Sequence, residues 1–162
     1  MSDVPITRER LLRILDGQAA KTRIVIAGLD ETQLSQPARQ DGWTAKEVLA
    51  HMAWGHEGML ACVLGQAVPG QEGPFDLDAF NEARRQQAAS LSVAEVLAWL
   101  EEARGSVRAL IEQLDEARYY DVIHTPWMGD HCLGQFLMFP ALHEGGHRTE
   151  LAAWRAAMET PA

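Results

Sequence analysis

Apolar residues recur at helical spacing in four long stretches of the chain. In each stretch leucine, isoleucine, valine or alanine returns every three or four residues, as on one face of an α-helix. N-capping residues mark where the stretches begin. Thr7 precedes the first, and Thr44 and Ser92, each followed three residues later by glutamate, form capping boxes before the second and third. The pattern therefore predicts long helices over residues 7–29, 45–64, 93–115 and 130–158.

The segments between these helices differ in length and composition. The stretch GQAVPGQEGP, after the second helix, is too rich in glycine and proline for regular structure and predicts a long loop. A shorter helix over residues 76–89 follows it. The stretch EARYYDVIHTPWMGDH mixes β-forming residues with Pro126 and Gly129, which predicts an extended loop that can include a short strand. Pro140 lies inside the predicted last helix and should kink it there.

This order of elements is typical of an all-α fold, a four-helix bundle with a long crossover between helices two and three. Such a crossover lets the second and third helices run parallel, which makes the second and fourth antiparallel. The 162 residues are the size of one domain, and a chain of this size buries about 70% of its unfolded surface. We therefore expect a single domain over residues 1–162 whose own core stabilises it.

Composition narrows the class of partner. The chain has 14 Lys plus Arg against 23 Asp plus Glu, a net charge of -9, which argues against nucleic acid or an anionic membrane as the main partner. No stretch approaches the roughly 20 apolar residues of a membrane span. Cys62 and Cys132 are too few for a disulfide framework, and the first residues lack the apolar segment of a secretory signal. We expect a cytoplasmic protein whose partner is a small molecule or another protein.

Three histidines are spaced to share one metal ion. His143 and His147 lie four residues apart, hence one turn apart on one face of the predicted last helix. His51 lies midway along the second helix in its buried stripe, so it can face the other two across the bundle. Three neutral imidazoles leave coordination positions open, which is typical of a catalytic metal. By spacing alone, histidines that only form hydrogen bonds are the alternative.

Two segments together resemble a known family. GWTAKEVLAHMAW in the second helix and HEGGHRTEL in the last are similar to the DinB-like (DinB/YfiT) superfamily, which includes the mycothiol-dependent maleylpyruvate isomerase type. The resemblance spans nearly the whole chain. It implies an up-down-down-up bundle, often a homodimer, in which His51, His143 and His147 bind a divalent metal, zinc or nickel above all.

The resemblance also implies a reaction. It points to thiol-dependent transfer or isomerisation of a small molecule, with a low-molecular-weight thiol as a further cofactor. A metal-dependent hydrolase, or a non-catalytic protein that binds or sequesters a small molecule, is the alternative. The residues of the predicted metal site are compatible with each of these three functions.

The chain departs from the family's common H-R-G-Q ending. Thr149 and Glu150 replace its glycine and glutamine, which keeps the three histidines but changes their neighbours. The stretches FNEARRQQ and TPWMG are similar to the related colibactin-resistance (ClbS/DfsB) type. The three histidines nevertheless fit the metal-binding branch better.

Several other residues are candidates for the site. Glu150 lies seven residues after His143 and returns to the ligand face, where it could orient a ligand or act in catalysis by accepting a proton. A surface salt bridge with an arginine is its alternative. Trp127, in a loop with proline and glycine, is predicted to line the pocket that binds a cofactor or substrate, and a core position is its alternative. His56 lies about 140° around the helix from His51 and is predicted at the rim or surface.

Gly145 and Gly146, between the two histidines, call for an explanation. Each glycine inside a helix costs about 1 kcal/mol relative to alanine. The two glycines could let a neighbouring helix or a substrate approach the metal closely. Close packing against the first helix is the alternative.

Overall fold

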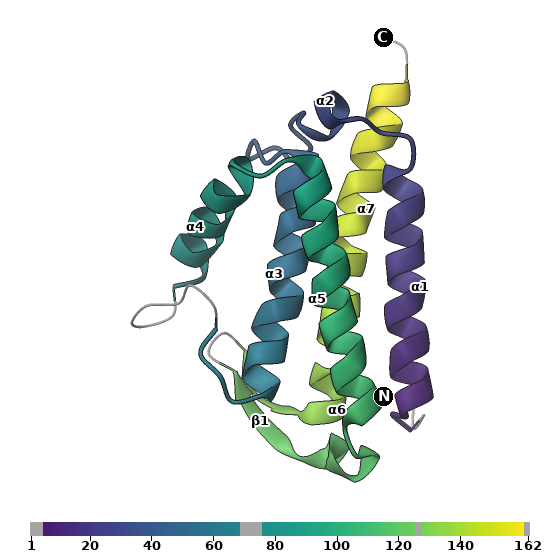
Figure 1. Ribbon diagram of the computed structural model, residues 1–162, viewed down its shortest axis with the longest axis vertical. Helices are drawn as coiled ribbons and strands as arrows, with labels where there is room; N and C mark the ends of the chain where they lie inside the picture. The colour runs from purple at the N-terminus through teal and green to yellow at the C-terminus, as the bar shows by residue number, and fades with distance from the viewer. Residues whose placement is uncertain (1–4, 69–75, 126–127, 161–162) are drawn as a thin grey trace.

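The computed structural model describes residues 5–68, 76–125 and 128–160. The long helices in these ranges are α1 (Arg8–Ile26), α3 (Ala45–Val63), α5 (Val93–Gln113) and α7 (Phe139–Glu159). In Figure 1, α1 rises from the base, α3 and α5 both descend, and α7 rises again beside α1. The predicted all-α bundle, with its up-down-down-up order, is therefore confirmed.

The predicted capping residues begin these helices. The Thr7 side chain accepts a hydrogen bond from the Arg10 amide. Both capping boxes form, between Thr44 and Glu47 before α3 and between Ser92 and Glu95 before α5. These polar residues satisfy amides that the first turn of a helix leaves unpaired, which is why the sequence located the starts so closely.

A short helix precedes α3. The helix α2 (Glu31–Leu34) begins with a further capping box, between Asp30 and Gln33, and is not among the helices predicted from the sequence. Leu34 anchors this helix in the core, where it is 2% exposed.

The crossover contains a helix that lies outside the bundle. This helix, α4 (Leu77–Ala89), runs alongside α3 in Figure 1. Two polar contacts tie its end of the crossover to the first turn of α3. Arg85 Nε lies 3.3 Å from Glu47 Oε1, and Lys46 Nζ donates to the Leu91 carbonyl at 2.6 Å. The crossover is thus fixed against the helix that carries His51.

The segment before α7 corrects the prediction. It contains a 3-10 helix (Glu116–Tyr120), an antiparallel hairpin of β1 (Val122–Thr125) and β2 (Gly129–Cys132), and a single turn, α6 (Leu133–Phe136). The last helix begins at Phe139, not near residue 130. The prediction placed its start too early because the buried residues Leu133, Phe136 and Leu137 continue the apolar spacing of α7. Pro140 therefore lies in the first turn, where its missing N–H leaves no bond broken, and the predicted kink was wrong.

The core surrounds α3. This helix packs against α4, α5 and α7 and is buried on nearly every side. One apolar cluster joins α3 and α5 towards α2, and a second joins α1, α5, α6 and α7 near the hairpin. Among the described residues, no helix combines the length and apolar character needed to cross a membrane. Cys62 and Cys132 are free thiols.

Candidate metal centre

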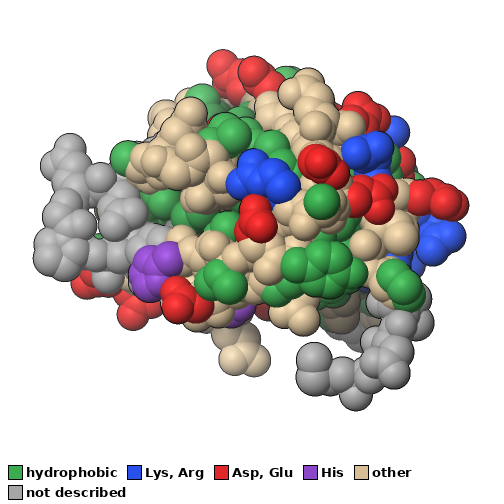
Figure 2. Space-filling model, turned by 90° about the horizontal axis from the view of Figure 1, so that it is seen from below, with side chains coloured by type: hydrophobic (Ala, Val, Ile, Leu, Met, Phe, Trp, Pro, Cys, Tyr) green, Lys and Arg blue, Asp and Glu red, His purple; other side chains and the backbone are tan. Residues whose placement is uncertain are grey.

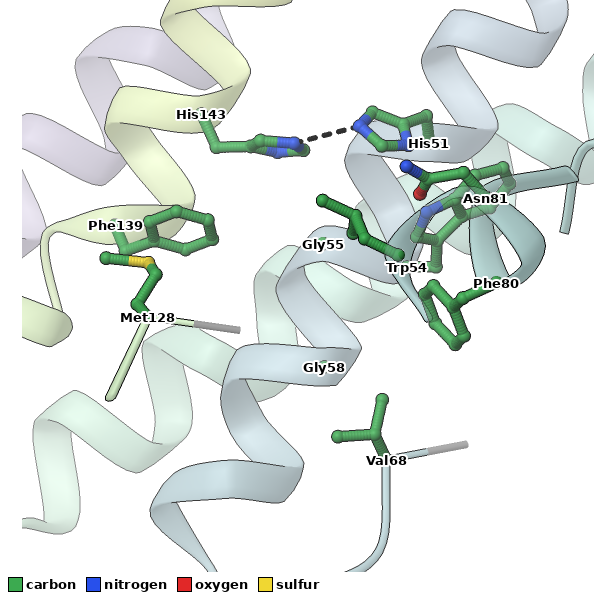
Figure 3. Close-up of a pocket in the computed structure, with 11 residues that line it drawn as sticks. His51, Trp54, Gly55, Gly58, Val68, Phe80, Asn81, Met128, Phe139 and His143 are labelled. Carbon is green, nitrogen blue, oxygen red and sulfur yellow. Dashed lines mark hydrogen bonds between the residues drawn. The ribbon is translucent and has the colours of Figure 1, made fainter. Parts of the chain in front are cut away.

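Three histidine side chains meet between α3 and α7. His51 comes from the middle of α3, and His143 and His147 come from successive turns of α7. His143 Nε2 lies 3.0 Å from His51 Nε2 and 3.2 Å from His147 Nε2. Figure 3 shows the rings of His51 and His143 pointing at each other across the space between the helices. The structure thus brings together the three residues that the sequence singled out.

The donor set fits a metal ion. One ligand nitrogen from each histidine can be chosen so that all lie within 4.8 Å of one another. Two nitrogens that are each about 2.1 Å from one ion are about 3.0 to 3.4 Å apart at angles of about 90° to 109°. Hydrogen bonds alone satisfy the group poorly, because the single Nε2 of His143 faces two other Nε2 atoms. A cation accepts all three lone pairs at once.

Burial keeps the imidazoles of His51 and His143 in the form that binds metals. It lowers the pKa of His51 to about 2, with help from the neighbouring His143 and His147. It likewise lowers the pKa of His143 to about 3. A ring that stays neutral offers a lone pair to an ion without first losing a proton.

Packing, more than hydrogen bonding, holds two of the rings in place. The Nδ1 atoms of His51 and His143 are buried and have no hydrogen-bond partner among the described residues. The His51 ring instead meets Trp43 and Trp54 edge-on, with centroids 5.5 and 5.0 Å away. The His143 ring stacks on Phe139 at 5.4 Å. These aromatic contacts fix the direction in which each Nε2 points.

Gly55 is a residue of this centre that the sequence analysis missed. It lies one turn after His51 on α3, against the His143 ring. A Cβ atom at this position would be 2.7 Å from Cε1 and 2.8 Å from Nδ1 of His143, closer than van der Waals contact allows. Only glycine lets the ring lie on the backbone of α3. The signal was present in the sequence, as a glycine inside a strong helical pattern at position i+4 from a proposed ligand.

The two glycines between the α7 histidines have different surroundings. A Cβ at Gly145 would lie 3.2 Å from Gln18 Oε1 on α1, so this glycine faces helix one, as the close-packing interpretation predicted. A Cβ at Gly146 would meet nothing within 4 Å. The Cβ positions of Gly145 and Gly146 therefore do not face a histidine ring. The close approach is made instead by Gly55 of α3, which lies against the His143 ring of α7.

Glu150 lies beside the third histidine. Its Oε2 is 3.0 Å from His147 Nδ1 and 3.5 Å from an Arg39 guanidinium nitrogen. Both interpretations from the sequence thus have a counterpart, the orientation of a ligand and a salt bridge with an arginine. His147 is the histidine of the three with a carboxylate on Nδ1, an arrangement that fixes the tautomer of metal-bound histidines. Trp127 lies outside the described residues.

His56 is buried, so its predicted place at the rim was wrong. The side chain is 0% exposed because α3 is enclosed on all sides, including the one away from His51. Nδ1 contacts the Met52 carbonyl at 2.8 Å, and Nε2 lies 3.6 Å from Glu144 Oε2. Burial lowers the pKa of His56, while the Met52 carbonyl and Glu144 act in the opposite direction.

Glu144 connects all four long helices. Its carboxylate accepts hydrogen bonds from Thr22 of α1 at 2.5 Å and from Arg104 of α5 at 2.5 and 3.1 Å, and it faces His56 of α3. Such a buried charge is tolerated only when it is paired and hydrogen-bonded. Glu144 directly follows His143, so the cluster fixes the turn of α7 that carries this ligand.

A cavity of about 340 Å³ adjoins the histidines. His51 and His143 form part of its wall (Figure 3). Most other lining residues are apolar or glycine, with three from α3 and two from α4: Trp54, Gly55, Gly58, Leu77 and Phe80. Phe139, Val68 and Met128 extend the apolar wall, and Asn81 is the additional polar residue. A small molecule in this cavity would lie directly against the histidine cluster.

Comparison with known proteins places the chain in a family. Residues 14–151 match the DinB superfamily. The chain belongs to this superfamily. YfiT of Bacillus subtilis (strain 168) is 25% identical over 153 residues, which cover 90% of this DinB-superfamily chain and 84% of YfiT. The structure of YfiT, described as a probable metal-dependent hydrolase with an unusual four-helix bundle topology, matches with a TM-score of 0.74 at 20% identity over 99% of this chain and 92% of YfiT.

Two further solved structures share the fold. The colibactin self-resistance protein ClbS, solved in complex with a dsDNA, matches with a TM-score of 0.77 at 15% identity over 98% of this chain and 99% of ClbS. A variant of the mycothiol-dependent maleylpyruvate isomerase matches with a TM-score of 0.74 at 15% identity over 93% of this chain and 63% of that protein. Likeness at this identity shows a common bundle, not a common activity.

The DNA in the ClbS complex bears on the expected partners of this chain. Figure 2 shows the hairpin end of the molecule, where lysine and arginine side chains are separated by acidic and apolar ones instead of forming one patch. Nucleic acids bind continuous basic surfaces. The expectation that this chain uses no nucleic acid therefore stays a prediction, supported on this face and by the net charge of -9.

Proposed function

We propose that this protein is a metal-dependent enzyme that acts on a small molecule with the help of a low-molecular-weight thiol. The observation that carries the proposal is the convergence of His51, His143 and His147 at one end of an apolar cavity. The three histidines would hold a divalent ion, with zinc and nickel both suited to imidazole. Such an ion supplies Lewis-acid chemistry, lowering the pKa of a thiol or water that reaches it.

The chain's own residues have separate tasks in this proposal. His51 and His143 line the cavity and direct their Nε2 atoms to its edge, so they would set where the reacting group lies. Glu150 would orient His147 through Nδ1. The aromatic residues around His51 and His143 would keep bulk water away from the reacting atoms.

The residues around the cavity favour a thiol over a water as the nucleophile. Among the described residues that line it, none is an aspartate or glutamate. A water must lose a proton to a base as it attacks, whereas a thiol ionises far more readily. In the transfer reaction the thiol's S–H bond breaks and a C–S bond forms at the acceptor carbon. The proton goes to the leaving group or, in an addition, to the neighbouring carbon; elimination of the thiol then completes an isomerisation.

Hydrolysis is the second candidate. It is favoured by YfiT, which is described as a probable metal-dependent hydrolase and is 25% identical to this chain. Glu150 would be the base that accepts the proton of the water. Its carboxylate is 45% exposed and contacts both His147 and Arg39 through Oε2, so Oε1 would accept the proton.

Metal analysis tests the centre itself. We expect about one divalent ion per chain in the purified protein and a loss of at least tenfold in metal affinity in His147→Ala. His124→Ala is the matched control, because this histidine is 74% exposed in the hairpin and is neither in the histidine cluster nor among the residues that line the cavity. Glu150→Gln should weaken metal binding less than His147→Ala does. If His147→Ala and wild type hold the same amount of metal, the proposed centre is wrong.

A thiol assay separates the candidate reactions. The metal-loaded protein is given 1-chloro-2,4-dinitrobenzene together with cysteine or N-acetylcysteine, and the formation of thioether is followed by absorbance. We expect metal-dependent thioether formation that His147→Ala lacks. Thiol-independent cleavage of p-nitrophenyl esters would instead support the hydrolase. A protein that holds metal but catalyses neither would be a binding protein. The implied homodimer stays a prediction for light scattering.

A further inference from the structure

The cavity beside the histidines has one polar end and one apolar end. In Figure 3 the Asn81 amide lies on the same side as His51, whereas Val68 lies at the opposite end. Asn81 belongs to the crossover helix α4, and its half-buried side chain forms no hydrogen bond with another described residue. The indole Nε1 of Trp54, on the same wall, is buried and has no hydrogen-bond partner among the residues that the structure describes. Polar atoms that lack partners inside a cavity are suited to a ligand with a carbonyl or amide group.

The remaining wall offers nothing to a charged ligand. Apart from the two histidines, the described lining residues include no lysine, arginine, aspartate or glutamate. A carboxylate or phosphate placed at the Val68 end, away from the histidines that would hold the metal, would lose its hydration without meeting a cation. Small thiols that carry carboxylates and amines therefore do not fit with their charged parts at that end. The cavity therefore suits the molecule that accepts the thiol, and not the thiol itself.

Exposed apolar side chains at the cavity also favour an uncharged, apolar ligand. Leu77 is 51% exposed and Met128 is 42% exposed, although both line the cavity. A ligand that covers them removes apolar surface from water, which stabilises the complex by about 25 cal/mol per Å². The volume of about 340 Å³ is at the small end of ligand pockets, enough for a single ring or a short alkyl chain.

We infer that the cavity binds the uncharged apolar part of the substrate, a ring or short alkyl chain joined to a carbonyl-containing group that lies between Asn81 and the histidines. This inference rests on the proposed function in placing the reaction at the three histidines. It goes further in assigning the cavity to the acceptor molecule, so that the thiol must approach from outside the cavity. Asn81 orients the carbonyl group, and the walls made by α4 select the apolar part.

A series of amides tests the assignment without relying on activity. Acetamide, butanamide and hexanamide share a head group, and 6-amino-6-oxohexanoate adds a carboxylate to the far end of the chain. Binding is followed by the chemical shifts of the protein as purified and again after treatment with a chelator. We expect affinity to rise about fourfold per added methylene, from the roughly 0.8 kcal/mol that burying each one contributes. The carboxylate probe should bind at least tenfold more weakly than hexanamide.

Variants locate the binding. Leu77→Glu places a charge on the cavity wall at an exposed position in the first turn of α4, where an acidic residue suits the helix. It should weaken hexanamide binding at least tenfold. Ile24→Glu, which is 71% exposed on α1 and not part of the cavity, is the control and should change nothing. Asn81→Leu should cost about fivefold, since it removes one hydrogen bond.

The outcomes separate the two proposals. If hexanamide binds as expected and the protein never holds a metal, the proposed function fails and the cavity assignment stands. If the protein holds its metal but affinity is independent of chain length, or Leu77→Glu and Ile24→Glu behave alike, the cavity assignment is overturned. Tighter binding of 6-amino-6-oxohexanoate than of hexanamide would also overturn it.

Discussion

Replacing Gly55 with alanine should weaken metal binding although the residue offers no ligand atom. The added Cβ would lie 2.7 Å from Cε1 of His143 and 2.8 Å from Nδ1. Carbon atoms in good contact are about 3.5 Å apart at the closest, so the ring must move by about 0.8 Å. Sites of this kind tolerate about 0.5 Å. We expect metal affinity to fall 10- to 100-fold, the range found when the support of a ligand histidine is removed.

The same substitution should change folding much less. Alanine favours a helix over glycine by about 1 kcal/mol, whereas overpacking costs about 1 to 3 kcal/mol. The net loss in the free energy of unfolding is therefore about 0 to 2 kcal/mol, measured by urea unfolding of metal-free protein.

Gly146→Ala is the matched control, because its Cβ would meet nothing within 4 Å on the helix that carries His143 and His147. It should raise the free energy of unfolding by about 0.5 to 1 kcal/mol and leave metal affinity unchanged. Affinities are read by competition with a chromophoric chelator. Wild-type affinity in Gly55→Ala would refute the idea that the missing side chain positions His143.

Two further predictions concern folding. Glu144→Gln should lower the free energy of unfolding, measured in urea, by about 3 kcal/mol, because the buried guanidinium of Arg104 loses the negative charge paired with it. The control is Glu112→Gln, at an exposed glutamate on α5, which should have little effect. In metal-free protein the pKa of His51 is lowered to about 2 and that of His143 to about 3 by burial, against about 6.5 in the unfolded chain. The unfolded state therefore binds more protons, and the free energy of unfolding should fall as pH drops from about 6.5 towards 3, by up to about 1.4 kcal/mol per pH unit for each histidine. A flat profile between pH 6 and pH 4 would contradict this.

The helices were predictable where local chemistry decides the structure. Thr44 and Ser92 begin α3 and α5 because side chain and amide meet within one turn, a contact that depends on no distant residue. The hairpin before α7 was not predictable in this way. Its strands pair residues such as Val122 and Cys132, which are ten positions apart. The apolar residues of α6 that follow it, Leu133 and Phe136, continue the helical spacing of α7 by coincidence.

The residues of the candidate site also fall into those that helical spacing predicts and those that depend on distant packing. The spacing of His143 and His147 places them on one face of any helix, and the buried stripe of the second helix includes His51. The burial of His56 and the role of Gly55 depend on what packs around α3. Helical spacing does not show which helices lie there, although a glycine inside the helix marked position 55. In a helix that packs on one side only, a residue turned away from the ligand face lies at the surface. The helix α3 is buried on nearly every side, so His56 is buried too.

The metal-binding histidines and part of the cavity wall lie on different helices, so substitutions at these two sets of positions have different consequences. The histidines are held by α3 and α7 inside a core whose residues constrain one another, so most substitutions there threaten folding. The positions of α4 that face the cavity, Leu77, Phe80 and Asn81, belong to a helix outside the four-helix bundle and are only partly buried or exposed. Phe80 packs against the core, whereas Leu77 and Asn81 are not part of the apolar clusters, so changes at these two positions should couple only weakly to the bundle. A lineage of such proteins can therefore vary what the cavity accepts, one surface substitution at a time, while the metal centre and the bundle stay as they are.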